Sequence, residues 1–352
     1  MTGALTAVFR KSLRPALLLT AFAGSVTAQG LSPLALAQGE IQKGRTAEAI
    51  RVLEDYRRQH PAVAETYNLL GVAYTSEGKT DQALAMYQEF ARLAPNRPEA
   101  YNNLGASFLQ HGDSVQAEKA FRQALALRAD DTDALYNLGS LLNTRHDYNQ
   151  ARPLLARALR RERTPGIVFE LAASQAGVGD RKQALRTLSS MPVPSGPEGL
   201  PWLRLVGTLS LDEGQWAEGT KALEQALKLA PDDEIVLYSL GLARLKSNQP
   251  AEAAALFERA FASMPVAERH FKTGALLAQH GADADAVTQF ERAVREDPKM
   301  YDAYFNLAVV QLRRKEINSA AEAFLDTNSK AARRPEATEC EPRAALHFTY
   351  IS

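Results

Sequence analysis

A segment of 34 residues recurs in register along this chain, and no other feature limits its fold as strongly. The segment is clearest at residues 98–131, where Tyr101 and Phe108 belong to one helical apolar pattern. Gly112 interrupts this pattern, and a second one begins near Ala117. The segment therefore predicts two helices joined by a tight turn. Because so short a hairpin cannot bury its own apolar face, it has to stack on copies of itself.

Equivalent segments, numbered as repeats one to nine, begin at residues 30, 64, 98, 132, 165, 200, 234, 267 and 301. Position 20 of each repeat holds a small residue: Ala49, Ala83, Ala117, Ala151, Ala184, Gly219, Ala253, Ala286 and Ala320. Position 24 holds a large one: Leu53, Tyr87, Phe121, Leu155, Leu188, Leu223, Phe257, Phe290 and Phe324. Position 8 is also small: it is glycine in six repeats, Gly71, Gly105, Gly139, Gly207, Gly241 and Gly274, and alanine in the other three. A small residue lets the second helix cross close to the first, and alternating small and large side chains let neighbouring layers interlock.

Position 15 ends the first helix of each repeat and is glycine in six of them: Gly44, Gly78, Gly112, Gly179, Gly214 and Gly281. A residue with a left-handed backbone conformation is favoured at this place. Asn248 tolerates that conformation, whereas His146 and Lys315 predict looser turns in repeats four and nine.

The pattern over residues 30–334 resembles the tetratricopeptide repeat family, whose landmarks it matches at Tyr101, Leu104, Gly105, Phe108, Ala117, Phe121 and Ala124, for example. The resemblance implies an all-α fold, a right-handed superhelical solenoid of about nine antiparallel helix-turn-helix units. It also implies that the first helices line a concave groove, which in this family commonly holds an extended or helical peptide. Such a fold specifies an architecture and leaves the function to particular residues.

Repeat five departs most from the pattern, and Pro192 is expected to cut its second helix short. Residues 192–201, PVPSGPEGLP, contain four prolines and two glycines and predict a loop. This loop separates repeats one to five, residues 29–191, from repeats six to nine, residues 202–334. It is either a hinge or a tight connection that keeps the superhelix continuous. Pro153, in the second helix of repeat four, is expected to kink that helix or to delay its start.

Residues 1–28 have the features of a secretory signal peptide. Three basic residues, Arg10, Lys11 and Arg14, precede the apolar run at 15–26, and small residues precede a cleavage point after Ala28. This pattern predicts a periplasmic or secreted protein. Two alternatives remain, a membrane anchor if the signal stays uncleaved and a mitochondrial presequence, because residues 1–39 contain no acidic residue.

The C-terminal tail, residues 335–352, is polar and rich in proline as far as Arg343. Its last apolar residues, such as Phe348, either remain disordered or fold back onto repeat nine. Cys340 is the only cysteine of the chain, so no internal disulfide can form.

Nothing in the sequence points to catalysis or to a cofactor. The six histidines fall at unrelated repeat positions, and no metal-binding HExxH, phosphate-binding loop or GxSxG sequence occurs. The 41 basic residues balance the 41 acidic ones, which gives no electrostatic reason to expect nucleic acid as a partner. We therefore expect a protein without enzymatic activity, cofactor, metal ion or small-molecule substrate.

The family geometry implies which residues line the groove. Repeats two and three contribute the polar residues Glu65, Asn68, Glu99 and Asn102. From repeat four onward, position 5 becomes mainly aromatic, with Tyr136, Phe169, Arg204, Tyr238, Phe271 and Phe305. Aromatic residues at this position either pack within the repeat or anchor a peptide.

The family's clamp for acidic chaperone tails has its nearest counterpart at Arg204, Thr208, Ser239, Glu268 and Lys272. Glu268 reverses a charge that the clamp requires, so this ligand is not expected. The sequence favours a non-catalytic scaffold or assembly factor that binds a peptide or a partner helix in a bacterial envelope. Its alternatives are a regulatory or substrate-recruiting subunit of an enzyme on a separate chain, and a mitochondrial adaptor.

Overall fold

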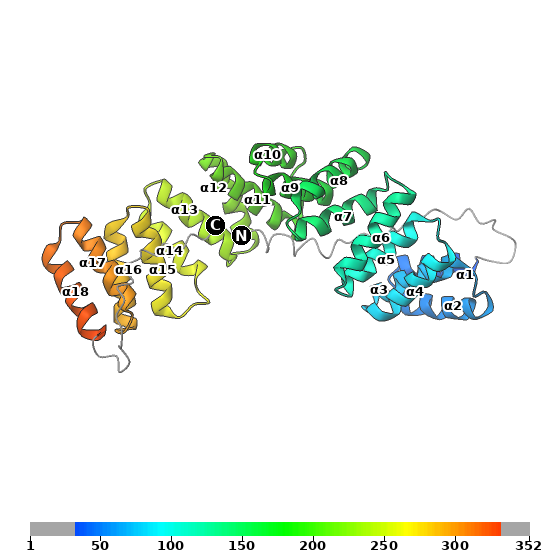
Figure 1. The fold of residues 1–352 in the computed structure, drawn as a ribbon, viewed down its shortest axis with the longest axis horizontal. Coiled ribbons are helices and arrows are strands. Elements are labelled where there is room, and N and C mark those ends of the chain that lie inside the picture. The colour runs from blue at the N-terminus through cyan, green and yellow to red at the C-terminus, as the bar shows by residue number, and fades with distance from the viewer. Residues whose placement is uncertain (1–31, 332–352) are drawn as a thin grey trace. The chain divides into compact units, whose positions relative to one another are not determined.

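The computed structural model describes residues 32–331, which form eighteen α-helices, one 3-10 helix and no strand (Figure 1). The predicted all-α fold is confirmed. The predicted signal peptide, the C-terminal tail and Cys340 lie outside the described residues. Within residues 32–331, no helix combines the length and the apolar character needed to cross a membrane.

The chain divides into two compact units, one up to Pro192 and one from Val193 onward. The helices of the first unit are α1 (Pro33–Gln42), α2 (Thr46–Gln59), α3 (Ala64–Ser76), α4 (Thr80–Leu93), α5 (Pro98–Gln110), α6 (Ser114–Leu127), α7 (Thr132–Thr144), α8 (Tyr148–Arg161), α9 (Pro165–Gly177) and α10 (Arg181–Ser189).

The second unit begins with η2 (Gly196–Glu198) and continues with α11 (Gly199–Asp212), α12 (Trp216–Leu229), α13 (Glu234–Lys246), α14 (Pro250–Ala260), α15 (Val266–Gln279), α16 (Asp283–Glu296), α17 (Tyr301–Arg313) and α18 (Ile317–Ala331). In both units each repeat is a helix pair, such as α5 with α6 or α15 with α16 (Figure 1). The second helix of each pair also packs on the first helix of the next repeat in the same unit.

The predicted interlocking of small and large residues occurs inside the six helix pairs that have glycine at position 8. In repeat three, a Cβ atom built on Gly105 of α5 lies only 2.6 Å from Cε1 of Phe121 in α6. In repeat seven, a Cβ atom on Gly241 lies 2.4 Å from the same atom of Phe257. Since real carbon atoms do not approach so closely, the absence of a side chain at position 8 makes room for the large residue at position 24.

The turns in repeats four and nine are as tight as the others, so the prediction of looser turns was wrong. His146 has φ 63° and Lys315 has φ 65°, in the same left-handed region as Gly112 at 88°. In repeat nine the N–H of Glu316 donates to the carbonyl of Gln311 over 2.9 Å, which reproduces the bond from Asp113 to Phe108 in repeat three. The packing of the two helices against each other fixes this turn. The free energy gained from that packing outweighs the modest cost of a left-handed backbone at a residue other than glycine.

The junction between the units differs in detail from the expected loop. Helix α10 has 9 residues, whereas α8 has 14, in agreement with an early end before Pro192. Helix α11 already begins at Gly199, and Pro201 lies in its first turn, where a missing N–H removes no intrahelical bond. Helix α8 continues through Pro153, so this proline does not delay the start of the helix.

Candidate partner-binding surface

The candidate polar residues of repeat two are bonded to one another on α3. Glu65 accepts a hydrogen bond from Nδ2 of Asn68 over 2.9 Å and pairs with Nη1 of Arg97 at 2.8 Å. Oδ1 of Asn68 in turn accepts a hydrogen bond of 2.9 Å from Nδ2 of Asn103 in the next repeat. These contacts tie α3 to α5.

Repeat three repeats the arrangement with Glu99 and Asn102 on α5. Glu99 is buried and pairs with Nη2 of Arg128 at 2.8 Å, while Oδ1 of Asn102 accepts a bond of 2.9 Å from Asn137. Burial raises the pKa of the Glu99 carboxyl, but a backbone N–H and Arg128 bind its charged form, and the net effect is a lowered pKa. The four polar candidates of repeats two and three thus stabilise the repeat stack.

Two aromatic candidates of the first unit are core residues. Tyr136 on α7 is 4% exposed, and Phe169 on α9 is fully buried. In the second unit, Arg204 on α11 is also buried, and its Nη1 donates to Oδ2 of Asp233 over 2.9 Å. Asp233 caps α13 through a bond from the N–H of Val236, so Arg204 connects α11 to the start of α13.

The remaining candidates, Tyr238, Phe271 and Phe305, form what we call the aromatic row. They occupy equivalent places on α13, α15 and α17, because each ring contacts the position-24 ring of its own repeat. The centroid distances are 5.7 Å from Tyr238 to Phe257, 5.9 Å from Phe271 to Phe290 and 6.0 Å from Phe305 to Phe324. Tyr238 and Phe271 are half-buried, whereas Phe305 is 45% exposed. Part of each ring is therefore accessible to a partner, while contacts within the repeat fix the orientation of the ring.

Lys272, the last candidate, is exposed on α15 next to Phe271. Its Nζ lies 6.0 Å from the ring centroid of Phe261, a residue that also stacks on Phe257 at 6.4 Å. Lys272 therefore borders the aromatic row between α13 and α15. At the other end of the row, Leu312 on α17 is 46% exposed, and the sequence pattern did not single it out.

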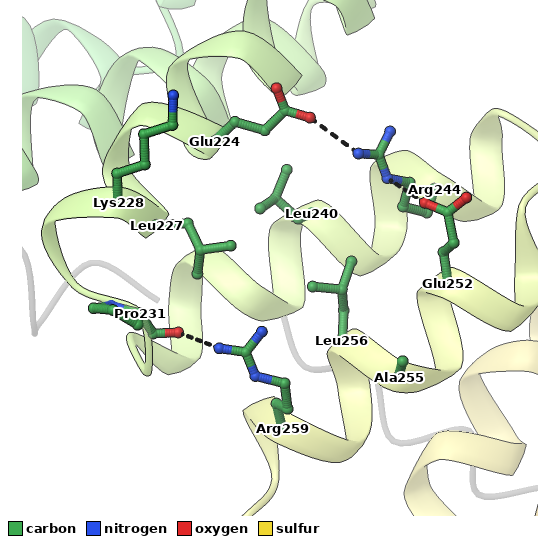
Figure 2. A pocket seen from close by; sticks show the side chains of 10 residues that line it. All are labelled: Glu224, Leu227, Lys228, Pro231, Leu240, Arg244, Glu252, Ala255, Leu256 and Arg259. Atoms are coloured by element: carbon green, nitrogen blue, oxygen red, sulfur yellow. Dashed lines mark hydrogen bonds and ion pairs between the residues drawn. The ribbon is translucent and has the colours of Figure 1, made fainter.

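Sequence reasoning also missed a pocket of about 630 Å³ formed by α12, α13 and α14 (Figure 2). Its apolar surface comes from Leu227, Leu240 and Leu256. At its rim Arg244 pairs with Glu224 at 3.0 Å and with Glu252 at 3.2 Å, as Figure 2 shows. No repeat motif predicts this pocket, because its size depends on the distance between α12 and α14, the second helices of two neighbouring repeats. Helix α13 lies between them.

Among residues 32–331, no group of three or more His, Cys, Asp or Glu side chains is placed to hold a metal ion. The aromatic row and its surroundings are suited to contact a partner surface.

Comparison with known families agrees with this architecture. The tetratricopeptide repeat model matches residues 34–98, 207–267 and 274–332, which together make up more than half of the chain. The chain belongs to the tetratricopeptide repeat family. A second model, the middle tetratricopeptide-like domain of cilia and flagella-associated protein 70, matches residues 67–183. Tetratricopeptide repeats generally serve as non-catalytic scaffolds for protein–protein interaction, so the family indicates protein partners.

Several solved tetratricopeptide repeat structures are similar to this one. PilW, described as a widely conserved type IV pilus biogenesis factor, shares 17% identity over 58% of this chain and 94% of its own, with a TM-score of 0.50. A tetratricopeptide repeat protein from Parabacteroides merdae shares 18% identity over 65% of this chain and 91% of its own, with a TM-score of 0.48. The Cut9-Hcn1 hetero-tetramer of the APC/C shares 13% identity over 82% of this chain and 57% of its own, with a TM-score of 0.41. At these identities the likeness shows the fold alone. No curated protein matches the sequence.

Proposed function

We propose that this protein is a non-catalytic scaffold or assembly factor that holds a peptide or a partner helix on the aromatic row. The observation that carries the proposal is the 45% exposure of Phe305, on a ring that α18 holds in place through Phe324. An exposed aromatic ring gains free energy when a partner covers it, and aromatic residues are frequent anchors of binding surfaces. Because the ring is already packed against the protein, little conformational freedom is lost on binding.

The proposed setting is a bacterial envelope, in the periplasm or outside the cell. Its support is the sequence of residues 1–28, in which basic residues precede a short apolar run and small residues precede Gln29. Sequencing of the mature N-terminus tests this setting. A mature chain that starts at Gln29 supports export, whereas retention of the apolar run supports a membrane anchor, and a mitochondrial adaptor requires cleavage at a different site.

Affinity capture from envelope extract tests the binding role. The wild-type protein is compared with the double variant Phe271→Ser/Phe305→Ser, and captured proteins are identified by mass spectrometry. A matched control is Val115→Ser/Leu229→Ser, which changes two residues that are 70% and 56% exposed on α6 and α12, two helices that carry no residue of the row. We expect the control to keep its partner and the row variant to lose it, with unchanged helicity by circular dichroism.

Equal capture by the row variant and the wild type would reject the row as the binding surface. Capture of an enzyme whose activity depends on this protein would favour the second candidate function, a regulatory or substrate-recruiting subunit. Turnover by the purified chain itself would overturn the non-catalytic proposal.

A further inference from the structure

Two carboxylates accompany the exposed end of the aromatic row. Glu268 precedes Phe271 on α15 by three residues, and Asp302 precedes Phe305 on α17 by the same number. Side chains three residues apart lie on the same face of a helix. Helices α15 and α17 contact each other. The structure therefore presents two equivalent carboxylate-and-ring pairs side by side, on consecutive repeats.

Both carboxylates are exposed, and neither forms an ion pair with a residue that the structure describes. Their counterparts in repeats two and three behave differently, since Glu65 pairs with Arg97 and Glu99 pairs with Arg128. Those arginines come from the connections at the ends of their repeats. In repeat eight the corresponding positions hold Asp297 and Met300, neither of which can neutralise Glu268.

Three cationic side chains of α15 and α17 contact groups other than the two carboxylates. Lys272, four residues after Glu268, places its Nζ over the ring of Phe261. Arg269 pairs with Glu258 at 3.2 Å, and Arg313 pairs with Asp283 at 2.7 Å. The two carboxylates beside the rings thus remain available to a cation from outside.

We propose that the aromatic row recognises a cationic segment of a partner protein, with two arginine or lysine side chains between apolar residues. The inference rests on the proposed binding role of the row and adds the chemistry of the partner. One cationic side chain pairs with Glu268 and covers the ring of Phe271, and a second does the same at Asp302 and Phe305. Arginine is preferred, because its planar guanidinium can stack on a ring while its N–H groups bond a carboxylate. The apolar residues between them cover the rest of the row.

Fluorescence anisotropy with three labelled peptides tests the proposal on the full chain. The peptides share the same leucine and phenylalanine positions and carry arginine, lysine or glutamate at the remaining positions. We expect the arginine peptide to bind most tightly and the glutamate peptide to bind at least about tenfold more weakly, with affinity for the arginine peptide falling as salt is raised.

The variant Glu268→Gln/Asp302→Asn removes both charges and keeps the side-chain shapes, and we expect it to weaken binding of the arginine peptide by about tenfold. The control Glu291→Gln/Glu322→Gln makes the same charge change in the same repeats, at exposed residues of α16 and α18, and is expected to bind as the wild type does.

Equal affinity for the arginine and glutamate peptides, no binding of any of the three, or equal losses in the variant and its control would each overturn the inference. Weaker binding in Phe271→Ser/Phe305→Ser together with unchanged binding in Glu268→Gln/Asp302→Asn would also overturn it, and would leave the row as a binding surface. Failure of the proposed function itself is seen separately, as unchanged partner capture by the row variant.

Discussion

The side-chain amide of Asn143 on α7 lies 2.7 Å from Oε2 of Glu170 on α9, and it also donates to the Glu170 carbonyl over 2.8 Å. Oε1 of Glu170 accepts a bond of 2.9 Å from the hydroxyl of Ser140. The carboxyl group is fully buried, and no described cation pairs with it. Burial therefore raises the pKa of Glu170, although the bonds from Asn143 and Ser140 lower it in part.

This carboxyl group makes the stability of the α7–α9 contact depend on pH. Since the folded protein holds the Glu170 proton more tightly than the unfolded chain does, its contribution to stability decreases as pH rises from the unfolded pKa through the folded pKa. Glu170→Gln keeps the shape without a charge: its amide oxygen can accept the bond from Asn143, and its amide N–H can donate to the hydroxyl oxygen of Ser140. We expect this variant to raise the free energy of unfolding at pH 8 by about 1 kcal/mol, and by less at pH 5. Urea denaturation at both pH values measures this, and a gain of the same size at pH 5 and pH 8 would contradict it.

Gly105→Ala is expected to destabilise repeat three. The new Cβ atom would lie 2.6 Å from Cε1 of Phe121, so α5 and α6 would have to move apart, at a cost of about 1 to 3 kcal/mol. Gly39→Ala in α1 is the matched control, because a Cβ atom there meets nothing within 4 Å. That control should be stabilising by about 0.5 to 1 kcal/mol, since alanine is the better helix former. Equal denaturation midpoints for the two variants would show that the Gly105–Phe121 contact does not limit the crossing.

Lys315→Gly is expected to stabilise the turn between α17 and α18. Lys315 has φ 65°, where glycine is free of the steric cost that other residues bear, and the gain should be up to about 1 kcal/mol. Lys79 follows the corresponding turn residue of repeat two, and its own φ is −85°, which any residue adopts without strain. Lys79→Gly should therefore be destabilising, because glycine loses more conformational freedom on folding. Thermal denaturation compares the two, and a loss of stability in Lys315→Gly would argue against a strained turn.

The connection between the two units is expected to be the first site of limited proteolysis. Residues 192–195 lie between α10 and η2 outside any helix, and most of them are exposed. Cleavage requires a segment that can leave its place and enter a protease. Trypsin has no basic residue to cut between 192 and 201, so elastase or subtilisin is suitable, with mass spectrometry of the fragments. Early cuts in the turns of other repeats, with none at 192–201, would favour a continuous superhelix over a hinge.

The repeat pattern by itself determined the family, the number of helices per repeat and the residues that interlock. Gly105 and Phe121 are recognisable as partners because a small residue at position 8 and a large one at position 24 recur along the chain. Both positions belong to the same hairpin, so the repeat sequence alone predicts their contact. The sequence places the first helix after the loop from residue 202, whereas α11 begins three residues earlier, at Gly199, and includes Pro201. Proline is excluded from helix interiors and accepted in a first turn.

The tertiary structure alone decided which candidates have exposed side chains. Position 5 holds an aromatic residue in both Phe169 and Phe305, yet the first is fully buried and the second is 45% exposed. The sequence also showed Glu99 and Glu268 as equivalent acids, whereas only Glu99 is neutralised, by Arg128. Exposure and charge pairing depend on residues about 30 positions away that packing brings close. A repeat motif determines the shape of each hairpin from neighbouring residues, and it carries no information about those distant contacts.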